Sequence, residues 1–287
     1  PCVEQQLEDA ELCCLVETYP AKHDTYEDYL KTLKIAYLYG KTVTLVNTHW
    51  PETNAIMLKN RRIGLSMSGV VQAFNKFSRR ELLNWCDRAY DHVHDLDHQY
   101  SDWFCVPRSV RMTSIKPSGT VSLLNGSTPG IHYPEDEYYI RRIRFAKSSE
   151  FVDILRNAGY TVEDDVYSPN TACVEFPVHE PFFVRGKREV SMWEQLEIAA
   201  QFQHFWADNS VSVTVTFKPE EADQIQTALE MYETRLKAVS FLRYQENSSR
   251  RCPPRSNQSS VWIHNRAVLV RSSAIAISVL YFRRRCE

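Results

Sequence analysis

The stretch Ser191–Tyr232 reads SMWEQLEIAAQFQHFWADNSVSVTVTFKPEEADQIQTALEMY, and its pattern decides the fold class. It opens with Ser191-Met192-Trp193-Glu194, whose capping-box spacing predicts the N-terminus of a helix. Apolar residues then alternate with Ser and Thr over residues 211–217, which is typical of a strand. Pro219 opens a second helix at a position that tolerates its missing N–H. Strands that alternate with helices predict parallel pairing and an α/β sheet or barrel.

The same alternation extends toward the N-terminus. Ser78-Arg79-Arg80-Glu81 again has capping-box spacing and precedes apolar residues at helical intervals, which predicts a helix. Another helix is expected from about Glu150, with Gly159 where a C-terminal cap belongs. The β-branched run Thr42-Val43-Thr44-Leu45-Val46 predicts a short strand that stops at Asn47.

Composition restricts the class of protein. The chain has 287 residues, of which 43% are hydrophobic and 24% charged, as in a globular protein of one large or two ordinary domains. Its net charge of −2 argues against general nucleic-acid or membrane-surface binding, although a local cluster of donors would suffice for a small anion. Eight Cys are too sparse for a disulfide scaffold and form no CxxC pair, which indicates a reducing compartment.

The last part of the chain has a different amino-acid composition. Residues 248–256 are rich in Ser, Arg and Pro, and the chain ends in Arg283-Arg284-Arg285-Cys286-Glu287. The apolar run between them, residues 274–282, is too short to span a bilayer as a helix, which needs about 20 residues. We therefore predict a domain over residues 1–242 and an aberrant or disordered tail over residues 243–287.

The first motif whose side chains could take part in a reaction is Pro1-Cys2-Val3-Glu4. Residues i and i+2 of an extended segment point the same way, so the Cys2 thiol and the Glu4 carboxylate can face one substrate. Sulfur offers hydrogen-atom or nucleophilic chemistry, and a carboxylate offers proton transfer. The pattern is weak alone, because a buried Cys near a surface Glu looks the same. Cys13, eleven residues further on, adds a thiol that could act as a reductant.

Two further segments offer donors to anions. In Lys116-Pro117-Ser118-Gly119-Thr120-Val121-Ser122, the glycine lets backbone N–H groups approach an anion, and the hydroxyls add donors. An ordinary turn after Pro117 is the alternative. In Arg61-Arg62-Ile63-Gly64-Leu65-Ser66-Met67-Ser68-Gly69, the two arginines could meet phosphate or carboxylate. Taken in isolation, that segment reads as a solvated loop.

Several other His and Cys residues are of a type that can bind metals or react, but we predict structural roles for them. His94 and His98 stand four apart and could bind a metal, yet no third ligand is evident, so we predict a solvated helix face and no metal site. Cys86 is expected in the core of its helix. Cys105 and Cys173 are likewise expected to be small buried apolar groups.

Together these motifs resemble ribonucleotide reductase. Residues 1–18 resemble its active-site loop, residues 116–122 its substrate phosphate loop, and residues 61–69 another segment typical of the family. The sequence of these motifs is most similar to that of class II, adenosylcobalamin-dependent ribonucleoside-triphosphate reductases. The similarity extends to Tyr139–Arg144 and Asp208–Ser212. The resemblance covers roughly residues 1–242 and excludes the tail.

The resemblance implies a fold and a set of site residues. The fold would be the C-terminal half of a ten-stranded α/β barrel, with Cys2 on the loop that enters its centre. Cys2 would hold the thiyl radical that removes the ribose 3′ hydrogen, and Glu4 would take the 3′-hydroxyl proton. Cys13 would be one of two reducing thiols, with the adjacent Cys14 as an alternative. The substrate phosphates would bind the following residues: Pro117, Ser118, Gly119, Thr120 and Ser122.

The resemblance also implies a cofactor and partners. These are adenosylcobalamin, a ribonucleoside triphosphate substrate and a thioredoxin-type dithiol reductant, in the cytoplasm and without a nucleic-acid or membrane partner. The chain begins inside the motif at Pro1, so we expect the C-terminal part of a longer enzyme, inactive by itself. One alternative is the large subunit of a class I reductase. Another is a non-catalytic remnant that binds nucleotide phosphate.

Overall fold

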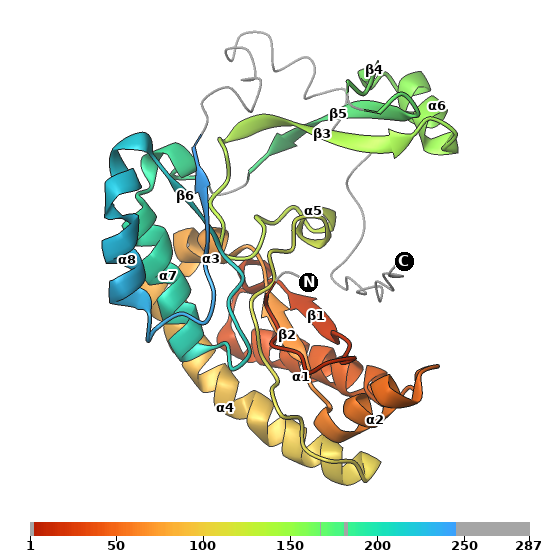
Figure 1. The fold of residues 1–287 in the computed structure, drawn as a ribbon, viewed down its shortest axis with the longest axis vertical. Coiled ribbons are helices and arrows are strands. Elements are labelled where there is room, and N and C mark those ends of the chain that lie inside the picture. The colour runs from red at the N-terminus through yellow and green to blue at the C-terminus, as the bar shows by residue number, and fades with distance from the viewer. Residues whose placement is uncertain (1–2, 167, 181–182, 245–287) are drawn as a thin grey trace. The chain divides into compact units, whose positions relative to one another are not determined.

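The computed structural model describes residues 3–166, 168–180 and 183–244. They divide into two compact units (Figure 1). Unit 1 comprises the described residues up to 134 together with residues 183–244, and unit 2 comprises the described residues between 135 and 180. Cys2 and the tail from residue 245 lie outside the described residues, and the predicted boundary after residue 242 stays a prediction.

A pair of buried parallel strands forms the centre of unit 1. Strand β1 (Leu15–Thr18) pairs with β2 (Gly64–Met67), with Leu15 opposite Gly64. Parallel strands need a long crossover, and here it contains three helices: η1 (Pro20–Lys22), α1 (Tyr26–Val43) and α2 (Pro51–Asn60). Two isolated parallel bridges, Leu65 to Thr113 and Ile115 to Val211, align further segments beside β2.

Long helices pack beside these strands (Figure 1). Helix α4 (Arg79–Phe104) packs against α1, α3 (Val70–Phe77) and α7 (Met192–Phe205). The predicted caps are confirmed, because the Ser78 and Ser191 hydroxyls accept hydrogen bonds from the backbone N–H groups of Glu81 and Glu194. The helices bury one apolar core, which includes Tyr29, Leu33, Leu82, Cys86, Val93 and Phe202. No helix in the described part of the chain is long and apolar enough to cross a bilayer.

The stretch that decided the fold class forms a strand–helix–strand unit. Strand β6 (Thr214–Phe217) pairs in parallel with β7 (Ser240–Arg243), and the crossover contains η3 (Pro219–Gln224) and α8 (Ile225–Tyr232). The predicted parallel pairing is therefore confirmed here. The strand is shorter than the pattern predicted, because Val211 makes its bridge to Ile115 instead.

Unit 2 is an antiparallel sheet with one helix. Its strand order is β3 (Tyr138–Ala146), β5 (Thr171–His179), β4 (Val162–Asp164), and α6 (Glu150–Asn157) precedes β4. This differs from the expected parallel pairing, because the connection from β4 to β5 is too short for a parallel crossover. The helix from Glu150 is confirmed, and Gly159 follows it with a positive φ of 87°. The described strands lie in three separate sheets, so the ten-stranded barrel stays a prediction.

Two local predictions are wrong. The run from Thr42 to Val46 does not form a strand, because α1 continues to Val43 and the Thr44 N–H still bonds to the Gly40 carbonyl. The buried face of α1 outweighs the strand propensity of this run. Cys105 is exposed, because it caps the C-terminus of α4 in a left-handed conformation. Cys86 and Cys173 are buried as expected.

A buried ion pair joins α1 to α4. Lys41 Nζ lies 2.7 Å from Asp97 Oδ1, and the two side chains are 0% and 2% exposed. Asp97 also accepts hydrogen bonds from the Tyr37 hydroxyl at 2.8 Å and from the Ser109 N–H at 3.0 Å. The carboxylate is thus fully partnered, which offsets the cost of removing both charges from water.

We predict that Lys41→Met lowers the free energy of unfolding by about 3–5 kcal/mol, because it leaves the Asp97 carboxylate buried without its counter-ion. The double variant Lys41→Met/Asp97→Asn should recover much of this loss, since it removes the buried charge, the amide oxygen can accept from the Ser109 N–H, and the amide NH2 can donate to the Tyr37 hydroxyl oxygen. Denaturant unfolding of the chain and both variants measures the difference. A double variant no more stable than Lys41→Met would contradict the prediction.

Candidate functional site

Glu4 lies buried beside the segment that contains Ser210. The side chain is 2% exposed, and the Glu4 carbonyl accepts a hydrogen bond from the Ser210 N–H at 3.1 Å. Its carboxylate oxygen Oε2 has no hydrogen-bond partner among the described residues. Buried polar atoms are nearly always hydrogen-bonded, so an unpartnered carboxylate oxygen marks a place where a polar ligand would be satisfied.

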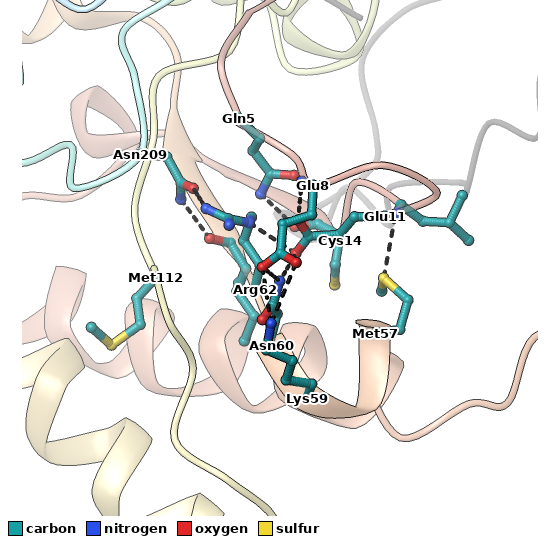
Figure 2. Close-up of polar contacts among 12 residues, drawn as sticks. Gln5, Glu8, Glu11, Cys14, Met57, Lys59, Asn60, Arg62, Met112 and Asn209 are labelled. Atoms are coloured by element: carbon teal, nitrogen blue, oxygen red, sulfur yellow. Dashed lines mark hydrogen bonds and ion pairs between the residues drawn. The ribbon is translucent and has the colours of Figure 1, made fainter. Parts of the chain in front are cut away.

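The loop that contains Glu4 and Cys13 is anchored by a buried ion pair (Figure 2). Glu11 Oε1 accepts from Arg62 Nε at 2.9 Å and from Asn60 Nδ2 at 3.1 Å. Arg62 Nη1 in turn donates to Asn209 Oδ1 at 3.2 Å. Arg61 and Arg62 are buried, so the expected solvated loop is wrong. Arg62 meets a carboxylate of the same chain, which was one of its two expected partners.

Asp208 and Asn209 fix the segment that reaches Glu4. The Asp208 carboxylate accepts from the N–H groups of Met112 and Thr113, at 2.9 and 2.8 Å. Asn209 Nδ2 donates to the carbonyls of Ile63 and Thr113, at 2.8 and 2.9 Å. Segments that are far apart in the sequence therefore meet through side-chain to backbone hydrogen bonds, and they position Ser210 next to Glu4.

The two adjacent cysteines have different environments. Cys14 is 2% exposed, its thiol donates to the Gly40 carbonyl at 3.3 Å, and burial raises the pKa of the thiol to about 12. Cys13 is only half-buried. Thiol–disulfide exchange requires a reachable thiolate. The surroundings therefore favour Cys13 over Cys14 as a redox thiol.

The residues predicted to bind phosphate lie on one loop, residues 116–130, which contains the short helix α5 (Val121–Leu124). The Ser122 hydroxyl donates to the Ser118 carbonyl at 2.6 Å, and Tyr19 holds the loop by donating to the Val121 carbonyl at 3.1 Å. Ser118 is buried, and its hydroxyl has no hydrogen-bond partner. A Cβ added at Gly119 would meet no atom of the described residues within 4 Å.

A further carboxylate, Glu17, lies fully buried at the base of this loop. Glu17 Oε1 accepts from the hydroxyls of Ser66 and Ser68, at 3.2 and 2.6 Å. Its Oε2 has no hydrogen-bond partner and lies 4.0 Å from Lys116 Nζ. Burial raises the pKa of Glu17 to about 7, with a smaller contribution from Glu4, because Lys116 and the two hydroxyls offset the desolvation only in part.

Most of the buried side-chain polar atoms that lack a hydrogen-bond partner belong to this region of unit 1. They come from the loop that contains Glu4, from strand β1, from the 116–130 loop and from the segments beside them: Glu4, Gln5, Glu17, Ser114, Ser118, Ser127, Thr128 and Ser210. Carboxylates, an amide and hydroxyls are groups that bind a polyhydroxylated, phosphorylated molecule. The region therefore offers hydrogen-bonding groups to a polar ligand.

The described residues do not offer a protein ligand set for a metal ion. Among them, no group of three or more His, Cys, Asp and Glu side chains could hold one. His94 and His98 lie on α4 without such a group around them.

Sequence reasoning missed Glu17, Ser66, Ser68 and Ser210 as site residues. A signal was present in the strands. Ser66 and Ser68 are two residues apart in an otherwise apolar run, so they point to one side. Glu17 is the charged residue of the buried strand LVET. Ser210 carried no comparable signal, because only the tertiary fold brings it to Glu4.

The chain is similar to known reductases, although no family model matches it. It is 51% identical over 243 residues to a Dictyostelium discoideum protein named "Probable adenosylcobalamin-dependent ribonucleoside-triphosphate reductase", covering 84% of the chain and 32% of that protein. It is 50% identical over 256 residues to the adenosylcobalamin-dependent ribonucleoside-triphosphate reductase of Euglena gracilis, covering 88% of the chain and 35% of that protein. The chain thus spans about a third of the length of these relatives.

Solved structures give the same result for the fold. A crystal structure of a B12-dependent (class II) ribonucleotide reductase matches with a TM-score of 0.79 and 30% identity, over 92% of this chain and 42% of the other. The class Id ribonucleotide reductase α subunit of Actinobacillus ureae matches with a TM-score of 0.61 and 17% identity, over 86% of this chain and 53% of the other. At that identity the second match indicates a shared fold alone.

We predict that Glu17→Gln alters the pH dependence of stability. A buried carboxyl with a raised pKa contributes stability at low pH that is lost as the pH rises through its folded-state pKa, here about 7. Between pH 5 and pH 8 the free energy of unfolding of the unaltered chain should therefore fall by about 2–3 kcal/mol relative to the variant. Denaturant unfolding at several pH values measures this, and parallel curves for the two proteins would contradict it.

Proposed function

Because the chain belongs to the class II, adenosylcobalamin-dependent ribonucleotide reductase family, we propose that it is part of an enzyme that reduces ribonucleoside triphosphates to 2′-deoxyribonucleotides. The observation that carries this proposal is the 50–51% identity to the reductases of Euglena and Dictyostelium over 84–88% of the chain. The activity is proposed for the whole reductase, because the chain spans about a third of those relatives. The cytoplasm is the location we propose for it.

In this proposal three residues of the chain act on the ribose. A thiyl radical on Cys2 takes the 3′ hydrogen atom, and Glu4 takes the proton of the 3′-hydroxyl while the 2′-hydroxyl leaves as water. Cys13 and a second thiol supply the two electrons and the hydrogens, and they end as a disulfide. At the end of the cycle the 3′ hydrogen returns from Cys2. The net reaction converts a ribonucleotide and two thiols into a deoxyribonucleotide, water and a disulfide.

Two features of the described residues support these roles. Glu4 is buried with one oxygen unpartnered, as a group that receives a substrate proton would be before substrate binds. Cys13 is the more accessible of the two adjacent thiols, as exchange with a dithiol reductant requires. We propose a thioredoxin-type dithiol as that reductant.

The 116–130 loop would bind the triphosphate. Gly119 has no side chain to hinder the approach of an anion, and the hydroxyl of Ser118, which has no hydrogen-bond partner among the described residues, and the charge of Lys116 lie on the same loop. When bound, adenosylcobalamin supplies the homolytic chemistry that starts radical formation. We derive no step through it from the described residues.

We predict that Gly119→Val weakens nucleotide binding without loss of fold. The added Cβ would meet no atom of the described residues, and the branched side chain would hinder the approach of the anion to the backbone. Titration calorimetry of the chain with each of the four ribonucleoside triphosphates should detect binding. The apparent affinity of the variant should be at least tenfold lower than that of the unaltered chain. Thermal unfolding provides the control for folding. Equal binding, or no binding by either protein, would remove this assignment.

We predict that residues 1–242 are catalytically competent when they replace the corresponding segment of the Dictyostelium reductase. This chimera should form deoxynucleotides with adenosylcobalamin and a dithiol, whereas the 287-residue chain by itself should form none. Cys2→Ser should abolish the activity of the chimera, and Glu4→Gln should lower it by about 10²–10⁴-fold.

Adjacent serine variants of the chimera distinguish the two thiols. Cys13→Ser should abolish turnover with the dithiol. Cys14→Ser should retain turnover, because a hydroxyl can still donate to the Gly40 carbonyl. The reverse result would assign the redox role to Cys14. Deoxynucleotide formation by the 287-residue chain alone would contradict the expectation that it is inactive.

A further inference from the structure

We propose that Glu17 is a positioning residue for the substrate triphosphate: its buried carboxylate fastens both ends of the 116–130 loop through the hydroxyls of Ser66 and Ser68. This inference deepens the proposed function and rests on it for the identity of the ligand. Neither the resemblance nor the motifs drew attention to Glu17 as a site residue.

The hydrogen bonds form two parallel relays that start at one oxygen atom. The Ser66 hydroxyl donates to Glu17 Oε1 at 3.2 Å and accepts from the Lys116 N–H at 2.8 Å. The Ser68 hydroxyl donates to the same oxygen at 2.6 Å and accepts from the Gly130 N–H at 3.0 Å. Lys116 and Gly130 are the first and last residues of the loop, so both of its ends are bonded to one carboxylate by way of a serine.

The backbone N–H groups fix the direction of both relays. A serine hydroxyl has one proton to donate and two lone pairs with which to accept. A backbone N–H can only donate, so each serine turns a lone pair toward it and gives its own proton to Glu17 Oε1, which accepts whether the carboxyl is ionised or carries a proton on Oε2. An apolar side chain at position 17 would leave both hydroxyls buried without this partner.

The two ends of the loop lie against each other, so one carboxylate can reach both. A Cβ added at Gly130 would lie 2.4 Å from the Lys116 carbonyl oxygen, and Gly130 has a φ of +51°. The N–H of Gly69 donates to the Thr128 carbonyl at 2.8 Å, which brings the end of β2 to the same place. The loop is therefore closed at its base, and the phosphate-binding residues Ser118 to Ser122 lie within the closed part.

Fixing the base of the loop bears directly on affinity. A loop already held in its bound conformation loses less conformational entropy when the ligand binds. Lys116 adds a second connection, because its ammonium lies 4.0 Å from Glu17 Oε2 while its N–H belongs to the Ser66 relay. If the two ends of the loop were released, its hydrogen-bond donors would no longer be held in the binding conformation. The affinity for a triphosphate should then fall, although Glu17 is not assigned a contact with it.

Hydrogen exchange of the 287-residue chain tests the positioning role without nucleotide. In Glu17→Leu, exchange at the N–H groups of Lys116 and Gly130 should accelerate at least tenfold. Glu17→Gln keeps an acceptor oxygen and should restore protection to within about threefold, in line with the small net effect of one hydrogen bond. The matched control is Glu221→Leu, because Glu221 is also buried and accepts from two backbone N–H groups, those of Met192 and Lys218. The control should leave Lys116 and Gly130 protected.

Serine variants keep the test decisive if Glu17→Leu fails to fold. Ser66→Ala should release the Lys116 N–H and spare Gly130, and Ser68→Ala should do the reverse. Unchanged exchange at both positions in Glu17→Leu or in the serine variants would overturn the proposal. Faster exchange spread evenly through α7 and the 116–130 loop would overturn it as well, because it would indicate general loss of stability.

Binding of inorganic tripolyphosphate separates this inference from the proposed function. The unaltered chain and Glu17→Gln should bind it with similar affinity, and Glu17→Leu or Ser66→Ala should bind at least tenfold more weakly. Equal binding by the unaltered chain and Glu17→Leu would overturn the positioning role alone. Absence of binding by the unaltered chain would overturn the assignment of the loop to phosphate, and with it the role of Glu17.

Discussion

The parallel pairing of β1 with β2 is the constraint on which the rest of the site depends. Its register sets Glu17 opposite Ser66 and Thr18 opposite Met67. Serines two residues apart on β2 point to one side of the strand, so Ser66 and Ser68 both reach the carboxylate of Glu17. A shift of one residue would turn all of these side chains away from one another. The strand pairing therefore decides where the 116–130 loop is attached, and β1 directly follows the loop that contains Glu4 and Cys13.

Two kinds of buried charge among the described residues bear on the site. Lys41 with Asp97, and Arg62 with Glu11, are fully partnered by ion pairs and further hydrogen bonds, so they join elements of unit 1 to one another. Glu4 and Glu17 are also buried, but each has an oxygen without a hydrogen-bond partner. Since burying an unsatisfied charged group is costly, such atoms are informative. Both belong to the region that the proposed function assigns to substrate, whereas the partnered pairs hold that region in place.

The adjacent thiols show how local geometry separates two residues that the sequence leaves equivalent. In an extended segment neighbouring side chains point in opposite directions. Cys14 is turned into the hydrophobic core, where the Gly40 carbonyl accepts its proton and burial raises the pKa of the thiol. Cys13 remains half-buried on the other side. The greater exposure of Cys13 supports its proposed role in exchange with a reductant, and motif register points to the same residue.

The sequence by itself determined the α/β class, the capped helices that begin after Ser78 and Ser191, the parallel strand–helix–strand unit near residue 219, and the resemblance to class II ribonucleotide reductases. These depend on local spacing, which a chain displays before it folds. Only the tertiary structure decided that the Thr42–Val46 run ends a helix, that Arg62 is buried against Glu11, and that Ser210 meets Glu4. It also decided that Glu17 joins both ends of the 116–130 loop. Such contacts join residues up to about two hundred positions apart, and their energies depend on desolvation and partner geometry, which no local pattern contains.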